Sequence, residues 1–225
     1  MTVGPYQIKV FLAGCMVADL FASFDTETTG LLDDPDARVV EVGVVLFDGD
    51  EPVEVYESFV CPGVLTSEGL RVAWEVSGIS EEMIRSGASP AIVWRDMGRF
   101  LRDFEVSVVG WNVPFDVAML HRTVFGTDDV QSRLVVLADV MWEFGRVFRP
   151  VTGGDPQNVD HGGVRRSTLN CARYVCGATF EGCAHSAAAD ALLCGRIYRG
   201  LVTGGMRPRQ PRVQEVRGTV WGRGR

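Results

Sequence analysis

The chain has 225 residues, of which 46% are hydrophobic and 23% are charged. This composition is typical of globular proteins, and the length suits one domain, or one domain with a tail. The formal net charge of −7 argues against a protein that coats long stretches of duplex nucleic acid, because such binding neutralises many phosphates. No segment reaches the length of a membrane-spanning helix, so we expect a cytoplasmic protein that does not contact a membrane.

The first third of the chain is predicted to form strands. Leu20–Thr26 is an apolar run, and Val39–Phe47 is rich in β-branched residues and ends at a hairpin turn signal. Val53–Cys61 alternates between apolar and polar residues. We therefore expect three consecutive antiparallel strands.

The middle of the chain changes to helical periodicity. A short helix is expected to start at Ser80, where two glutamates follow a capping residue. The elements expected after it are a helix at Ala91–Phe104, a strand at Val106–Gly110, a helix at Pro114–Phe125, and a strand at Leu134–Val140 that runs into Met141–Phe148. Thr168–Cys176 and Ala187–Leu201 are expected to be the last helices.

The order of these elements predicts an α/β domain with a mixed central β-sheet flanked by helices, compatible with the ribonuclease H-like arrangement. We expect this domain to span residues 19–203, after an extension at 1–18 in which either Met1 or Met16 is the start. Residues 204–225 are rich in Arg, Gly and Pro and are expected to be disordered. The polar, glycine-containing stretch 150–166 is too long for a routine connection, so it is either mobile or functional.

Two carboxylates lie one residue apart at the end of the first strand. Asp25 and Glu27 should project to the same side, because side chains alternate along a strand. Carboxylates on one face repel each other and hold protons unless a cation lies between them. A divalent cation with hard oxygen ligands, such as Mg²⁺ or Mn²⁺, would fit. The alternative is a solvated acidic pair with no ligand.

Two later segments bring further candidates. A short strand should deliver Asn112 to the edge of the sheet, and Asp116 then falls in the first turn of a helix, where the helix dipole alone favours a carboxylate. His185 precedes a helix in which small residues surround Asp190. Taken singly, these residues could be a helix-start charge and a surface or capping histidine.

Together, the three segments resemble the Exo I, II and III motifs of the DEDDh (DnaQ-like) family of 3'-5' exonucleases. The matching segments, in order, are Asp25-Thr-Glu-Thr-Thr-Gly-Leu31, Asn112-Val-Pro-Phe-Asp116 with Leu120, and His185-Ser-Ala-Ala-Ala-Asp190-Ala191. The segment Arg38–Gly43 resembles the second strand of the family, and Val76–Ser80 resembles its segment that lines the pocket for the terminal nucleotide. Within the family, Thr-Thr-Gly-Leu is most similar to the epsilon proofreading subunit of bacterial replicative DNA polymerase.

This resemblance implies an enzyme that removes nucleoside monophosphates from the 3' end of nucleic acid, with DNA favoured, in proofreading or repair. It implies two divalent cations, Mg²⁺ or Mn²⁺, held by catalytic carboxylates, and a histidine that acts as general base toward the attacking water. The implied metal ligands are Asp25, Glu27, Asp116 and Asp190, and the general base is His185. The implied substrate-binding residues are Thr26, Thr29, Gly30, Leu31, Val76, Gly78, Ile79, Asn112, Phe115 and His185.

The expected partner is a single-stranded or frayed 3' end of DNA, with a polymerase subunit as a second candidate partner. An RNA-trimming exoribonuclease of the same fold stays open as an alternative, because the residues named do not separate deoxyribose from ribose. A non-catalytic polymerase adaptor is a third hypothesis, which an intact set of four acids disfavours. The sequence leaves the oligomeric state open.

Overall fold

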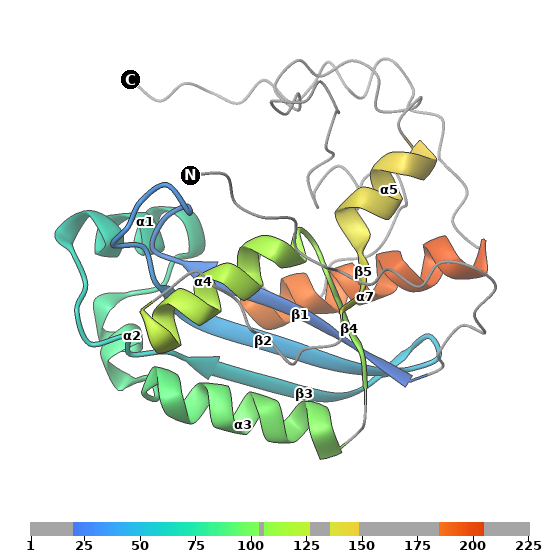
Figure 1. Ribbon diagram of the computed structural model, residues 1–225, viewed down its shortest axis with the longest axis horizontal. Coiled ribbons are helices and arrows are strands. Elements are labelled where there is room, and N and C mark those ends of the chain that lie inside the picture. Colours follow the sequence, from blue (N-terminus) through green and yellow to red (C-terminus); the bar gives the residue numbers. More distant parts are fainter. Residues whose placement is uncertain (1–19, 104–105, 127–135, 149–184, 205–225) are drawn as a thin grey trace.

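The computed structural model describes residues 20–103, 106–126, 136–148 and 185–204 (Figure 1). Within these ranges the strands form one five-stranded sheet in the order β3-β2-β1-β4-β5. The strands are β1 (Leu20–Thr28), β2 (Val39–Asp48), β3 (Glu51–Phe59), β4 (Val108–Gly110) and β5 (Val136–Asp139). The first three strands pair antiparallel, whereas β4 pairs parallel with β1 and β5 pairs parallel with β4. The predicted mixed central sheet is therefore confirmed.

Helices cover both faces of this sheet. They are α1 (Ser67–Ser77), α2 (Glu81–Ser86), α3 (Pro90–Asp103), α4 (Val113–Phe125), α5 (Val140–Phe148) and α7 (Ala187–Thr203). Figure 1 shows α7 behind the sheet, where it lies against β1 and β2, and α4 on the opposite face. None of the helices within the described residues combines the length and the apolar character that crossing a membrane requires.

Strand β1 is buried on both faces, which explains its continuous apolar sequence. Phe21 packs in the cluster that includes α7, where its ring stacks on Phe47 with centroids 5.0 Å apart. Ala22 and Phe24 point the other way, into the cluster that α3 and α4 form with the sheet. On the α7 side, a Cβ at Gly195 would lie 2.1 Å from the Phe47 ring, so glycine allows the helix to approach closely. Strand β1 is thereby held between two layers of helix.

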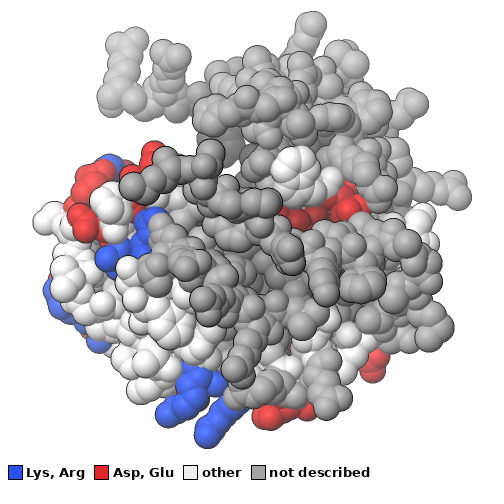
Figure 2. Space-filling model, viewed as in Figure 1, with Lys and Arg blue, Asp and Glu red and all other residues white. Residues whose placement is uncertain are grey.

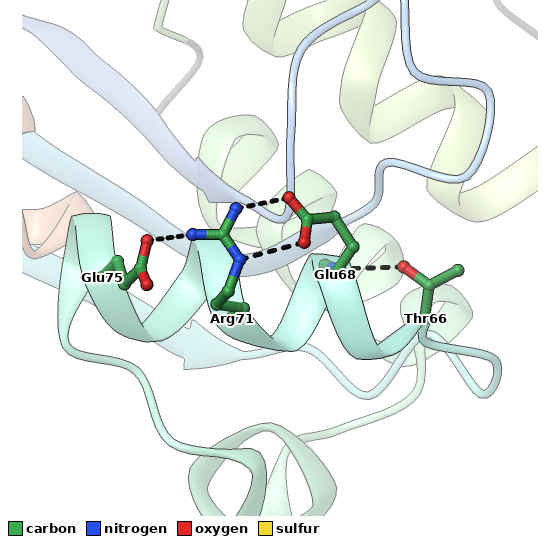
Figure 3. A network of polar contacts seen from close by, with 5 residues as sticks. Thr66, Glu68, Arg71 and Glu75 are labelled. Carbon is green, nitrogen blue, oxygen red and sulfur yellow. Dashed lines mark hydrogen bonds and ion pairs between the residues drawn. The ribbon is translucent and has the colours of Figure 1, made fainter.

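Helix α1 was not predicted from the sequence, although it carries recognisable end signals. The hydroxyl of Thr66 accepts a hydrogen bond from the backbone N–H of Gly69 at 2.9 Å, which is a helix N-cap (Figure 3). Gly78 ends the helix in the left-handed conformation, with φ 68°. On the exposed surface, Arg71 pairs with Glu68 and Glu75 along the same helix (Figure 3). The cap fixes where α1 starts, and Gly78 fixes where it stops, within the segment expected to line the nucleotide pocket.

Several predicted boundaries are wrong in detail. The strand predicted at Leu134–Val140 gives way to helix α5 at Val140, because Asp139 Oδ1 accepts a hydrogen bond from the backbone N–H of Met141 at 3.1 Å and starts the helix. The strand predicted to reach Cys61 ends at Phe59. The extension at 1–18, the 150–166 stretch, the helix predicted at 168–176 and the tail after residue 204 lie outside the described residues.

Candidate active site

The two acids of the first motif lie on one face of β1, as predicted. Asp25 pairs with Gly43 of β2, and Glu27 pairs with Glu41 two positions along. Glu27 is 8% exposed and Glu41 is 4% exposed. Charged side chains are rarely this buried without a partner, so this end of the sheet concentrates carboxyl groups that need compensation.

Asp116, the acid of the second motif, is tied directly to the first motif. It lies in the first turn of α4 and is 3% exposed. Its Oδ1 accepts hydrogen bonds from Thr26, at 3.1 Å from the backbone N–H and at 2.7 Å from the hydroxyl. These bonds bring Asp116 beside β1, and they also occupy the N–H and the hydroxyl of Thr26, a residue predicted to bind substrate.

The third motif reaches the same place because helix α7 begins directly on strand β2. A Cβ at Gly43 would lie 2.2 Å from Ala188 N and 2.3 Å from Ala187 C, so only glycine allows this contact. Glu41 Oε2 accepts a hydrogen bond from the backbone N–H of Ala187 at 2.9 Å. Asp190 follows within the first turn of α7 and is thereby carried to the acids of β1.

Three of the predicted residues form a cluster that could hold a metal ion. One ligand atom from each of Glu27, His185 and Asp190 lies within 4.8 Å of the others. His185 is exposed and has a left-handed backbone, with φ 64°, just before α7. A left-handed conformation is uncommon for a residue other than glycine and often marks a functional position.

Electrostatic repulsion links all four predicted acids, including the two that are not part of this three-residue cluster. Burial raises the pKa of Asp25 well above its ordinary value, and repulsion from Asp116, Asp190 and Glu27 raises it further. Burial also raises the pKa of Asp116 to about 8, against the hydrogen bonds from Thr26 that lower it. Carboxyl groups that oppose one another's ionisation in this way form a natural site for a cation.

Glu27 and Asp190 show the same trend. Burial raises the pKa of Glu27 to about 7, although a hydrogen bond from the Ser77 hydroxyl to Glu27 Oε2 opposes the shift. Burial raises the pKa of Asp190 too, and the neighbouring His185 partly offsets it. The donor set consists of hard carboxylate oxygens with one imidazole, which fits Mg²⁺ or Mn²⁺ rather than a soft metal.

Two residues that support this site had no role predicted from the sequence. Ser77 is the last residue of α1, and its bond to Glu27 joins that helix to the acids. Glu41 is a buried carboxyl in an otherwise apolar strand, and burial raises its pKa to about 7. A glutamate among buried valines was a sequence signal that could have identified Glu41. No comparable signal marked Ser77.

The loop after β1 holds three of the predicted substrate-binding residues. Thr29 is 1% exposed, its N–H donates to Arg38 O at 2.9 Å, and its hydroxyl accepts from the Arg38 N–H at 2.8 Å. The carbonyl of Gly30 accepts from the Thr28 hydroxyl at 2.8 Å. Leu31 is 67% exposed. Thr29 therefore shapes the loop, while Leu31 offers apolar surface to solvent.

The predicted nucleotide-lining segment divides in a similar way. Val76 is 54% exposed at the end of α1, and Trp74, which precedes it by two residues on the same helix, is 62% exposed. Gly78 makes the left-handed turn. Ile79 is only 3% exposed and packs in a small core cluster with Ala73. The side chain of Ile79 is therefore part of the core, and the exposed apolar side chains of this region are those of Trp74 and Val76.

The two remaining predicted residues flank the start of α4. Asn112 has a left-handed backbone, with φ 66°, and its N–H donates to Asp139 Oδ1 at 3.2 Å. Phe115 is half-buried and packs against the core cluster under α4. Both help to set the position from which Asp116 points to β1.

The sequence of this chain is similar to the sequences of known proteins. The family model described as exonuclease (RNase_T) matches residues 23–198, which include all three motifs. The PolC-type DNA polymerase III of Pediococcus pentosaceus is 31% identical over 117 residues, and the same type of polymerase from Thermotoga maritima is 32% identical over 112 residues. These alignments cover 51% and 48% of this chain, but each covers only 8% of the polymerase.

Solved structures share the fold at low sequence identity. The nuclease domain of 3'hExo, a DEDDh family member bound to rAMP, has a TM-score of 0.61 at 16% identity and covers 85% of this chain and 95% of that domain. E. coli exonuclease I, in complex with a dA16 oligonucleotide, has a TM-score of 0.60 at 16% identity and covers 86% of this chain and 42% of that protein. The shared fold is the ribonuclease H-like arrangement predicted from the sequence. The match over residues 23–198 shows that this chain belongs to the exonuclease family.

Proposed function

We propose that the chain is a metal-dependent 3'-5' exonuclease that releases nucleoside monophosphates, with DNA as the favoured substrate. The observation that carries this proposal is the meeting of four acids and a histidine, from three distant segments, at one end of the sheet. Burial and mutual repulsion raise the pKa values of these acids. A protein without catalytic use for such a cluster would gain stability by losing it.

In this proposal Asp25, Glu27, Asp116 and Asp190 hold two divalent cations. Bound there, the cations would orient the scissile phosphate and stabilise the charge that develops on the attacking and leaving oxygens. Thr26 keeps Asp116 oriented through the two hydrogen bonds at 3.1 and 2.7 Å. Ser77 does the same for Glu27.

His185 is proposed to take the proton from the attacking water. Its exposure allows the imidazole to exchange that proton with solvent after each cycle. Asp190 lies beside this imidazole, with one ligand atom of each residue within 4.8 Å of the other. The exposed side chains of Leu31 and Val76 would offer apolar contacts to the terminal nucleotide without reading its sequence.

The charge distribution favours binding to the end of a nucleic-acid strand over binding along a long duplex. Figure 2 shows the charged side chains of the described residues in separate small groups on the face in view. With a net charge of −7, attraction for phosphate would depend on cations bound in the acidic cluster. This arrangement fits a single-stranded or frayed 3' end.

DNA is favoured because the relatives at 31% and 32% identity are DNA polymerases. Association with a polymerase belongs to the same proposal. RNA is the second candidate substrate, because the similarly folded 3'hExo domain was solved with rAMP bound. The distinction depends on contacts at the 2' position of the sugar.

The test is digestion of matched 5'-labelled DNA and RNA oligomers, each single-stranded or with a mispaired 3' end. Wild type should shorten DNA stepwise from the 3' end with Mg²⁺ or Mn²⁺ and should be inactive in excess chelator. Asp25→Ala and Asp116→Ala should lose activity by about 10³-fold or more. Glu54→Gln, at an exposed acid of β3, is the matched control and should keep wild-type activity. Shortening at the parental rate by Asp25→Ala would exclude the proposed catalytic centre, whereas faster digestion of RNA than DNA would select the second substrate.

A further inference from the structure

Glu41 connects the second strand of the sheet to the first residue of α7. We infer that Glu41 is a positioning residue that holds the start of α7, and with it His185 and Asp190, in the arrangement that catalysis requires. The inference rests on the proposed function for its effect on turnover, but its structural part can be measured without any activity.

The contact between β2 and α7 is unusually close. Glu41 and Gly43 project from the same face of β2, because they are two residues apart. Gly43 leaves room for the backbone of the helix, with Ala188 N only 2.2 Å from where a Cβ would be. Glu41 then accepts the N–H of Ala187 at 2.9 Å, in a buried setting. The glycine provides the space, and the glutamate provides the attachment.

This attachment replaces the usual helix cap. Ser186 occupies the N-cap position of α7, but its side chain makes no capping hydrogen bond. The Ser186 hydroxyl instead donates to Glu57 Oε1 at 3.1 Å on the exposed surface. Thus a carboxylate from β2 accepts the hydrogen bond of the first amide of the helix. The helix dipole also favours a negative charge at this position.

Catalytic groups lie on both sides of the attached residue. His185 is two residues before Ala187, and Asp190 is three residues after it. The N–H of Asp190 donates to Ser186 O at 2.9 Å, so the backbone of Asp190 is fixed to the same turn. If the first turn frays, the cluster of His185 and Asp190 with Glu27 loses its geometry. Displacement of about 1 Å is enough to slow an enzyme by about 100-fold.

Two substitutions of similar size separate this role from simple packing. Glu41→Met fills the same space without an oxygen acceptor, and Glu41→Gln keeps an amide oxygen for the Ala187 N–H. We expect Glu41→Met to lower kcat by about 10–100-fold, as loss of an orienting partner typically does, with little change in KM. Glu41→Gln should recover most of the activity, since a neutral acceptor keeps about half the strength of a charged one. Ser186→Ala removes only the exposed bond to Glu57 and should behave as wild type.

The second readout is amide hydrogen exchange in metal-free protein. Exchange of the Ala187 and Asp190 amides should accelerate by about 10-fold or more in Glu41→Met, and by much less in Glu41→Gln, because local opening exposes these amides. Amides in β1 should exchange as in wild type, which shows that the fold is intact. Equal exchange at Ala187 in Glu41→Met and wild type would overturn the inference, whatever the rates of digestion. An inactive wild type with accelerated exchange in Glu41→Met would instead refute the proposed function and leave the attachment standing.

Discussion

Replacing Glu27 by glutamine should inactivate the enzyme and make the metal-free protein more stable. Burial raises the pKa of Glu27 from 4.5 to about 7. Each unit of pKa shift corresponds to about 1.4 kcal/mol, so ionised Glu27 costs the folded state about 3 kcal/mol above pH 7. Glutamine carries no charge and can still accept the hydrogen bond from the Ser77 hydroxyl.

The sign of the pH dependence follows from the raised pKa. Between about pH 4 and pH 8 the folded protein binds more protons at Glu27 than the unfolded chain does. The stability of the wild type therefore falls as pH rises through this range, and Asp25, Asp116 and Asp190 add to the same trend because their pKa values are raised too. Removing the Glu27 charge should raise the free energy of unfolding by about 3 kcal/mol at pH 8 and by little at pH 4.

Urea denaturation of chelator-treated protein at pH 4 and pH 8, followed by circular dichroism, measures this difference. Glu54→Gln is the matched control, because it makes the same chemical change at an exposed position of β3, and it should alter stability little at either pH. If Glu27→Gln is no more stable than the wild type at pH 8, then Glu27 carries no buried charge. That result would refute the raised pKa values inferred for the whole acidic cluster.

Three further perturbations test the same site. Mg²⁺ or Mn²⁺ at about 100 times its dissociation constant should stabilise the wild type by about 2.7 kcal/mol in thermal melts, and should stabilise Glu27→Gln much less; equal stabilisation of both would place the ion elsewhere. Gly43→Ala should destabilise the protein by about 3 kcal/mol in urea denaturation, because the added Cβ would overlap the backbone of α7; wild-type stability would contradict that contact. Arg122 is 7% exposed and donates to the carbonyls of Leu32 and Asp34 at 2.9 and 2.6 Å. Arg122→Ala should therefore lower the free energy of unfolding by about 1–3 kcal/mol and speed limited proteolysis in the loop after β1. Unchanged proteolysis would show that other contacts hold this loop.

The fold class and the family could be predicted from the sequence because their signals are local. Asp25 and Glu27 share a face through the two-residue period of a strand. Asp116 could be placed in the first turn of a helix from the proline two residues before it. Each motif was visible within about ten residues, and three motifs in the right order identified the family.

Other features depend on pairing between distant segments, which local patterns do not encode. The register that sets Glu41 beside Glu27 and Gly43 beside Asp25 joins different strands. The contact of Gly43 with Ala188 spans most of the chain. Nothing in the sequence near either residue shows that they touch, so the attachment of α7 through Glu41 could be seen only in the folded structure.

Helix α1 is a different case, since its signals were present. Thr66 is a good N-cap, Glu68 lies in the first turn, and Gly78 marks the end. Its interior includes Val72 and Val76, both residues that favour strands, and these weakened the helical pattern. Likewise Val140 looks like the last residue of a strand, although Asp139 turns it into the first residue of a helix.

The position of α7 has a consequence for biosynthesis. The ribosome makes Asp25 and Glu27 before Asp190, which belongs to a helix that follows every strand of the described sheet. A nascent chain can pair its strands and still lack one of the four acids and the histidine. Nuclease competence would therefore arise only after α7 has been made and has packed on β2, and a product truncated before that helix would be unable to attack nucleic acid in the cell.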